Sequence, residues 1–380
     1  MSKSGLEQLL DCFSDLEDPR VVGRTDHHLL DILVLAICAI LCGADDWEAV
    51  ELWGKAKIDW LKGYIELENG IPSHDTIGRV FAALDSKRFQ ECFTRWVSTI
   101  CGSLAGQVIA IDGKTMRGSS DRRLGKKAIH MVSAFASEQG ITLGQIKTDE
   151  KSNEITAIPE LLEMLALKGS VVTIDAMGCQ TEIVKTIVEK EADYVVSLKG
   201  NQGNLHQQIA DFFNTAEQYD YKDIACKPDV SYDKGHGRIE TRRVVALPAT
   251  YLENVSMWGG LQSIIMVEST RQTHEKTTQE KRFYISSLPA DSLQIGKAIR
   301  AHWGIENQLH WCLDVTFNED LCQTRLANAA ENFNTLRKIT MNLLKLNTSD
   351  KKRSIPKKRF FAALNDDYLA EVLGLVPSQF

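Results

Sequence analysis

Hydrophobic residues in the first hundred positions recur at the spacing of amphipathic helices. The most apolar stretch, Leu29–Cys42, is too short to span a bilayer and carries an aspartate, so it predicts a buried helix. Asp46–Gly63 repeats apolar and aromatic residues every three or four positions. Ser73 or Asp75 is placed to cap a helix that continues through IGRVFAALD, and SKRFQECFTRWVSTI predicts another. We therefore predict an all-helical N-terminal domain over residues 1–104.

From Val108 onward the hydrophobic residues fall in short runs that are typical of strands. The runs VIAID, HMVSAFAS and ITLGQIKT predict strands, and the chain then alternates predicted helices and strands up to residue 200. Consecutive strands followed by alternating helices and strands predict a mixed sheet with helices on its faces. An antiparallel meander that leads into β–α–β units is the order of a ribonuclease H-like fold. The predicted fold class is therefore α/β with such a core.

The second half of the chain predicts a β-rich segment followed by a long helix. Residues 203–219 have helical periodicity, and RIETRRVVAL, SIIMVESTR and KRFYISSL predict a β-rich insertion at about residues 230–288. Helical periodicity returns over Gln294–Leu313. We assign residues 105–345 to one α/β domain that contains the insertion, and residues 346–380 to a basic C-terminal tail.

The net charge of −7 argues at first sight against a nucleic-acid partner. DNA binding, however, needs only a local basic surface, and a metal enzyme must itself carry clustered acids. Basic residues cluster in Lys114–Lys127 and in Lys351–Arg359, although the second cluster fits a solvated tail as well as a DNA contact. The nine cysteines form no CxxC pair and no zinc-finger spacing. We expect reduced thiols in a cytosolic protein without a secretory leader.

Two aspartates stand at matching positions on the predicted sheet. Asp112 ends one apolar strand and precedes a glycine, and Asp175 ends another and precedes Ala176. Either aspartate alone could cap a turn, but buried carboxylates are rare without a partner or a metal. The carboxyl ends of strands in an open α/β sheet are also where ligands bind. The matching positions therefore favour one shared site over two separate caps.

A third acid would complete a site for divalent metal. Carboxylates supply the oxygen ligands, and two ions about 3.5–4 Å apart can activate a nucleophile and stabilise a leaving oxygen in phosphodiester cleavage. Glu306 is the favoured third acid because its helix is otherwise apolar and aromatic, although an exposed helical glutamate fits the same pattern. Its rivals just downstream are Asp314, Glu319 and Asp320. Such a site suits magnesium or manganese, so we favour carboxylates over His236 and His310 as ligands.

Long ordered strings along the chain match those of one protein family. In the α/β domain they are AIDGKTMRGS, IKTDEKSNEITAIPELLEML, TIDAMGCQ, YVVSLKGNQG, HGRIETR and IRAHWGIENQLHWCLDVTFNED. These strings resemble the insertion-sequence DDE transposases, and the H-repeat-associated branch most of all. GIPSHDTIGRVFAAL and DILVLAICAILCGADDWEAVE are similar to that branch's N-terminal associated domain. The resemblance runs from about Ser14 to about Leu375.

The resemblance implies a ribonuclease H-like core with a β-rich insertion before the final catalytic helix. It implies that Asp112, Asp175 and Glu306 are the catalytic and metal-binding acids, with two Mg²⁺ or Mn²⁺ ions as cofactors. The implied partner is double-stranded DNA, both the element's terminal inverted repeats and the target, bound by a homodimer. We expect no membrane contact, and a location in the bacterial cytoplasm, on the nucleoid when DNA is bound.

Basic and polar residues near these acids are the candidates for DNA contacts. The wider superfamily places Tyr, Arg and Lys around its final glutamate, at positions held here by Ile299, His302 and Leu313. No phosphate contact carries over to these three by resemblance, and His302 or Arg300 is the hypothetical substitute. The candidates, whose donors suit phosphate oxygens, are Lys114, Lys199, Asn201, Gln202, Arg238, Arg300 and His302. The helical N-terminal domain fits a DNA-binding unit and a structural cap equally well.

The leading prediction is metal-dependent DNA strand cleavage and strand transfer of an insertion element. One alternative is a catalytically silent, domesticated transposase descendant that binds DNA without cutting it. Another is a nuclease that hydrolyses DNA without joining it. Metal-dependent cleavage separates the first alternative from an active transposase, and strand-transfer products separate the second.

Overall fold

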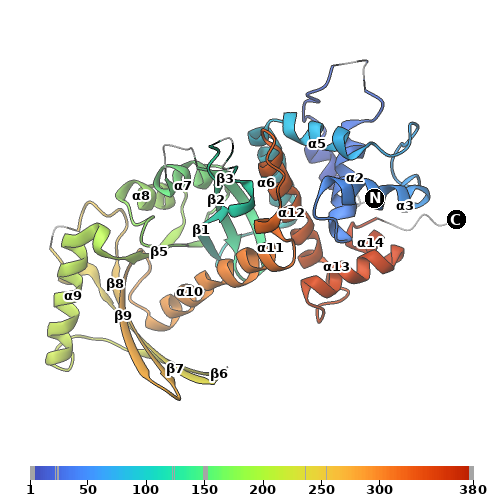
Figure 1. Cartoon of the computed structure of the whole chain (residues 1–380). Coiled ribbons are helices and arrows are strands. Elements are labelled where there is room, and N and C mark those ends of the chain that lie inside the picture. Colours follow the sequence, from blue (N-terminus) through green and yellow to red (C-terminus); the bar gives the residue numbers. More distant parts are fainter. Residues whose placement is uncertain are drawn as a thin grey trace.

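The computed structural model describes residues 5–21, 23, 25–121, 123, 125–148, 153–235, 237–253 and 255–375. They form a helical region, a nine-stranded sheet with helices on its faces, and C-terminal helices that lie beside the helical region (Figure 1). His236, considered above as a metal ligand, lies outside the described residues. No helix within the described ranges is both long enough and apolar enough to cross a bilayer.

The first hundred residues form helices, as predicted. They are α1 (Gly5–Phe13), α2 (Leu29–Leu41), α3 (Trp47–Ala56), α4 (Ile58–Leu61), α5 (His74–Ala83) and α6 (Ser86–Ile100). Ser73 rather than Asp75 caps α5, because its hydroxyl accepts a hydrogen bond from the Thr76 N–H. Helix α2 is buried along nearly its whole length and packs against α3 and α12 (Ala329–Leu346). This apolar helix therefore joins the N-terminal region to the C-terminal part of the chain.

A single mixed sheet forms the centre of the fold, with the strand order β3-β2-β1-β4-β5-β9-β8-β7-β6. The strands of its first half are β1 (Val108–Met116), β2 (Ile129–Ala136), β3 (Ile141–Lys147), β4 (Val171–Ile174) and β5 (Asp193–Leu198). Strands β1, β2 and β3 form an antiparallel meander, while β1, β4 and β5 run parallel. This order confirms the predicted ribonuclease H-like core.

The predicted β-rich insertion extends the same sheet. Its strands are β6 (Asp229–Gly235), β7 (Arg238–Pro248), β8 (Ser263–Thr273) and β9 (Thr277–Ser286). Strand β9 pairs antiparallel with β5, and β8, β7 and β6 follow in turn. Sequence analysis identified β7, β8 and β9 but not β6, an edge strand with almost wholly exposed side chains and therefore no apolar alternation.

Helices cover both faces of the sheet. Helices α7 (Glu154–Glu163) and α8 (Thr181–Glu189) lie on one face, while α10 (Ser292–Gly304) and α11 (Trp311–Val315) cross the other (Figure 1). Helix α9 (Gly203–Gln218) packs against β9. Between α10 and α11 the chain forms a π-helical segment, Ile305–His310.

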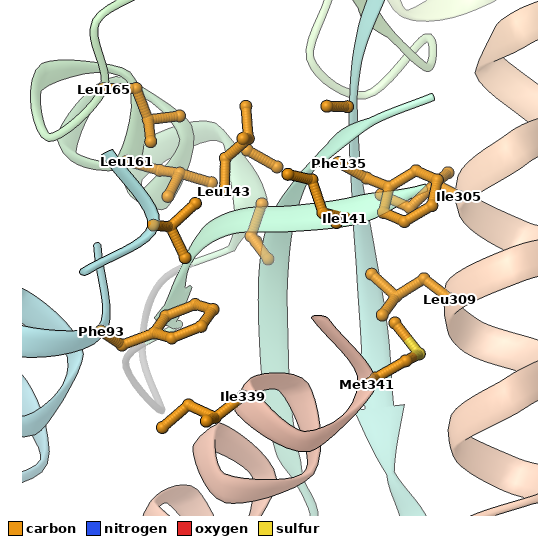
Figure 2. Packing of buried hydrophobic residues seen from close by; sticks show 14 of the residues in the cluster. Phe93, Phe135, Ile141, Leu143, Leu161, Leu165, Ile305, Leu309, Ile339 and Met341 are labelled. Carbon is orange, nitrogen blue, oxygen red and sulfur yellow. The ribbon is translucent and has the colours of Figure 1, made fainter. Parts of the chain in front are cut away.

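The π-helical segment is fixed to the core by two apolar side chains. Ile305 and Leu309 are fully buried and project toward Phe135, Ile141 and Met341 (Figure 2). Because these anchors lie on one side of the segment, the polar residues between them are held in one orientation. The segment is thus a rigid support for whatever chemistry its polar side chains perform.

The prediction of a solvated basic tail was wrong for residues 347–375, the part of it that the structure describes. Helices α13 (Ile355–Leu364) and α14 (Asp366–Val372) pack against each other and against α12. Lys358 and Arg359 are buried, and they donate hydrogen bonds to carbonyl groups in the last turns of α12 and α2, at 2.7 and 2.8 Å. Cations at helix C-termini satisfy carbonyl groups that have no partner within the helix.

Candidate active site

Two neighbouring strands carry the first two predicted acids. Strands β1 and β4 run parallel in register, with Ile111 beside Ile174. The next residue along each strand is Asp112 or Asp175, so both carboxylates leave the sheet on the same face, side by side. The side chains that come directly before and after each aspartate along the chain point to the opposite face, toward α7. The parallel register therefore places the two aspartates at adjacent positions, although β1 continues to Met116, so Asp112 lies within its strand and not at its end as predicted.

The π-helical segment brings a glutamate and a histidine to the first of these aspartates. Nδ1 of His310 lies 3.6 Å from Oδ2 of Asp112 and 3.5 Å from Oε2 of Glu306. One nitrogen or oxygen atom from each of the three residues lies within 4.8 Å of the other two. Sequence analysis favoured carboxylates and set His310 aside, although its spacing of four residues from Glu306 places both side chains on one helical face.

The charges at this site favour a bound cation. Burial and the adjacent Glu306 carboxylate raise the pKa of Asp112 to about 8. The contact with His310 lowers the pKa of Glu306 to about 2. Without a cation, the two carboxylates therefore avoid mutual repulsion by keeping a proton on Asp112 at neutral pH. A divalent cation would take the place of that proton, and the mainly carboxylate donor set suits magnesium, manganese or calcium.

The turn after β4 holds Asp175 in place. Its Oδ1 accepts hydrogen bonds from backbone N–H groups two and three residues further on, at 2.9 and 3.4 Å. Asn201 and Gln202 donate to carbonyl groups of the same turn, at 2.6 and 2.9 Å. His302 bonds to the hydroxyl of Thr173 at 3.0 Å, and burial lowers its pKa despite the charges of Asp175 and Glu306. Asn201, Gln202 and His302 thus support the site, and their DNA contacts stay a prediction.

Lys114, two residues beyond Asp112 on the same face, is surrounded by carboxylates. Its Nζ lies 2.7 Å from both Asp314 and Glu319, and 3.4 Å from Asp320. These are the three rivals for the role of third acid, and the structure gathers them around Lys114 rather than around Asp112. A phosphate would have to displace these carboxylates to reach the lysine, so its DNA contact also stays a prediction.

Arg238 and Arg300 line a groove between α10 and the β6–β9 half of the sheet. The groove encloses about 970 Å³, and its other lining residues include Arg242, Arg271, Arg282 and Trp303. Arg300 pairs with Asp233 at 2.6 Å, and Arg238 pairs with Glu240 at 2.7 Å. Both arginines are partly exposed, and Lys199 is exposed just after β5. These three candidates therefore remain accessible to a polyanion.

Comparison with known families accounts for nearly the whole chain. Residues 10–97 match the family model described as DDE_Tnp_1-associated, and residues 103–343 match the model described as transposase DDE domain. The chain belongs to the DDE transposase family. This confirms the family resemblance found in the sequence, and membership implies a transposase role, DNA as partner and the use of divalent metal.

Relatives of this transposase occur in Escherichia coli. One is "Putative transposase YncI" of strain O157:H7, 44% identical over 375 residues that cover 97% of this chain and 95% of that protein. Another is "H repeat-associated putative transposase YhhI" of strain K12, 42% identical over 380 residues that cover 97% and 98%. These relatives confirm the H-repeat-associated branch of the transposases.

A solved structure of similar fold is a piggyBac transposase synaptic complex with hairpin DNA. The alignment covers 98% of this transposase and 78% of that chain, with a TM-score of 0.44 and 11% identity. So distant a likeness carries no functional argument.

Proposed function

We propose that this transposase is catalytically active, cutting DNA at the ends of an insertion element and joining those ends to a target. The observation that most supports activity is the convergence of Asp112, Glu306 and His310, whose donor atoms lie within 4.8 Å of one another. Asp175 leaves the neighbouring strand on the same face. A protein that only bound DNA would gain nothing from carboxylates so close that the pKa of one rises to about 8.

Asp112, Asp175 and Glu306 would hold the metal, which we propose to be two Mg²⁺ or Mn²⁺ ions. When bound, such ions supply Lewis-acid activation of the attacking oxygen and charge stabilisation of the leaving oxygen. The protein's contribution is to hold the ligands still. The parallel register keeps Asp175 beside Asp112, and the N–H groups of the following turn orient its carboxylate.

The proposed reaction exchanges one phosphodiester bond for another. In cleavage, a water oxygen attacks the phosphorus at the element's end, and the bond to the 3′ oxygen breaks to leave a 3′-hydroxyl. In strand transfer, that hydroxyl attacks a target phosphodiester, and a target 3′ oxygen leaves in its place. Glu306, whose side chain is 53% exposed, is the acid with access to solvent, and we assign it the transfer of the nucleophile's proton.

DNA would lie partly along the groove that Arg238 and Arg300 line. Its lining cations are Lys234, Arg238, Arg242, Arg271, Arg282 and Arg300, and its lining acids are Glu138, Asp233, Glu240 and Glu280. Six cations against four acids give this groove a net charge of +2, although the whole chain carries −7. A local basic surface is what phosphate binding requires. Because an element has two ends, we propose that two copies of the transposase act together on DNA.

The test is a cleavage assay on a labelled duplex that carries the element's predicted terminal repeat. Magnesium, manganese and a chelator are compared for the wild type, for Asp175→Asn, and for Glu182→Gln as a control at an exposed acid of α8. We expect metal-dependent cleavage by the wild type and the control, and DNA binding without cleavage by Asp175→Asn. A wild type that binds the duplex but never cleaves it would instead be a silent DNA-binding descendant.

A further inference from the structure

His310 is a buried side chain with one unsatisfied ring nitrogen. The residue is 5% exposed, and its Nε2 atom has no hydrogen-bonding partner among the described residues. A structural histidine in a core normally has both nitrogens satisfied, because burying an unpaired polar group costs free energy. Its other nitrogen, Nδ1, faces the carboxylates of Asp112 and Glu306.

The distances from Nδ1 suit two ligands of one ion better than a hydrogen bond. N–H···O hydrogen bonds have donor–acceptor distances of about 2.7–3.2 Å, whereas the observed separations are 3.6 and 3.5 Å. Ligand atoms about 2.1 Å from a common metal, at angles between octahedral and tetrahedral, lie roughly 3.0–3.5 Å apart. Nδ1 is therefore spaced from each carboxylate oxygen much as neighbouring ligands of a single cation would be.

The local backbone fixes this spacing. Glu306 and His310 both lie on the π-helical segment, a rare conformation that occurs frequently at functional sites. Ile305 directly precedes Glu306 and Leu309 directly precedes His310. Both apolar side chains are fully buried in the core (Figure 2). The two polar side chains are thus aimed together at Asp112 by a support that packing holds rigid.

We propose that Nδ1 of His310 is a metal ligand, so that the cation beside Asp112 and Glu306 is held by nitrogen as well as oxygen. The inference rests on the proposed function in one respect only, namely that these two acids bind a cation. Magnesium and calcium prefer oxygen ligands, whereas first-row transition ions accept imidazole nitrogen, and Mn²⁺ is the weakest binder among them. The nitrogen ligand therefore raises the affinity of this site for Mn²⁺ relative to Mg²⁺ above the ratio that a site made of carboxylates alone would have.

The experiment uses electron spin-echo spectroscopy of Mn²⁺ bound to the full-length protein. A nitrogen ligand couples magnetically to Mn²⁺, and the coupling changes when the protein's histidines carry ¹⁵N in place of ¹⁴N. We expect this coupling in the wild type and in His274→Gln, at an exposed histidine between β8 and β9, and its loss in His310→Ala. By calorimetry, His310→Ala should weaken Mn²⁺ binding by about tenfold or more and Mg²⁺ binding by less, as loss of a nitrogen ligand requires.

Each outcome decides the proposal. Bound Mn²⁺ without nitrogen coupling in the wild type would refute it, and so would coupling that persists in His310→Ala or disappears in His274→Gln. The ¹⁵N comparison needs no substitution, so it decides the presence of a histidine ligand even if His310→Ala does not fold. Failure of the ligand proposal would leave metal-dependent cleavage intact, whereas a wild type that neither binds Mn²⁺ nor cleaves DNA would refute the proposed function as well.

Discussion

Lys338 offers a quantitative test of the polar cluster buried behind the candidate site. Its side chain is 1% exposed, on α12, and its Nζ donates hydrogen bonds to Oγ of Ser133, at 2.6 Å, and to the side-chain oxygen of Gln145. Ser133 pairs with Asp112 across the sheet, so Lys338 lies on the same face as the acids. Burial lowers the pKa of Lys338 from 10.5 to about 7, although the charge of Glu319 opposes that shift.

The depressed pKa makes stability depend on pH in a defined direction. Between pH 7 and about 10.5 the unfolded chain carries a proton on this lysine that the folded protein has released. Stability must therefore rise with pH across this window, by about 1.4 kcal/mol per pH unit for this one group. Between pH 8 and 9.5 the gain is about 2 kcal/mol, and Lys338→Met abolishes it.

The assay is urea unfolding of the wild type and Lys338→Met at both pH values, followed by tryptophan fluorescence. The free energy of unfolding of the wild type, relative to the variant, should increase by about 2 kcal/mol from pH 8 to pH 9.5. Comparing the two proteins at each pH cancels the titration of every other group. Lys185→Met, at a side chain that is 61% exposed, is the matched control and should show no such difference. Parallel pH profiles for the wild type and Lys338→Met would refute the reasoning, because Lys338 would then be charged in the folded protein.

Further substitutions test the neighbouring structure. Lys114→Met leaves Glu319 buried without its closest cation, so the free energy of unfolding, measured in urea, should fall by about 3–5 kcal/mol. A fall of less than about 1 kcal/mol would contradict the buried ion pair. Arg300→Ala should weaken DNA binding and reduce the salt dependence of that binding by about one charge. The melting temperature should change little, because the ion pair between Arg300 and Asp233 is exposed. Unchanged DNA affinity would show that Arg300 does not contact DNA. Gly178→Ala would place a Cβ atom 2.3 Å from the side chain of Ile174, and this clash should shift the turn that orients Asp175. The rate of DNA cleavage should therefore fall about a hundredfold. Cleavage at the wild-type rate would show that the turn tolerates the shift.

The parts of the fold that follow from hydrophobic pattern could be predicted. Strands β1, β4 and β5 are apolar because helices cover both faces of the sheet, and apolar runs of that length identify buried strands. Strand β6 could not be found, because its side chains are mostly polar and exposed, and its backbone pairing with β7 leaves no apolar pattern in the sequence. The C-terminal helices were missed because buried lysine and arginine look the same in sequence as solvated ones.

The candidate site could be predicted in part for the same reason. Asp112 and Asp175 each follow a run of apolar strand residues, and the parallel register of β1 and β4 places them at adjacent positions. The π-helical segment leaves no signature in the sequence, since it differs from an α-helix only in its hydrogen bonds. The environment of Lys114 was equally hidden, because its carboxylate partners come from a segment two hundred residues away in the chain.

The central claim, a transposase that joins DNA rather than only cutting it, is tested most directly with a pre-cut element end. A labelled duplex ending in a 3′-hydroxyl, and the same duplex ending in a 3′-deoxy nucleotide, are each incubated with a plasmid target and Mn²⁺ or Mg²⁺. The account predicts joined product from the hydroxyl end only, and none with the chelator or with Glu306→Gln. Plasmid that is cut but never joined, whichever end is supplied, would contradict the account and identify a nuclease.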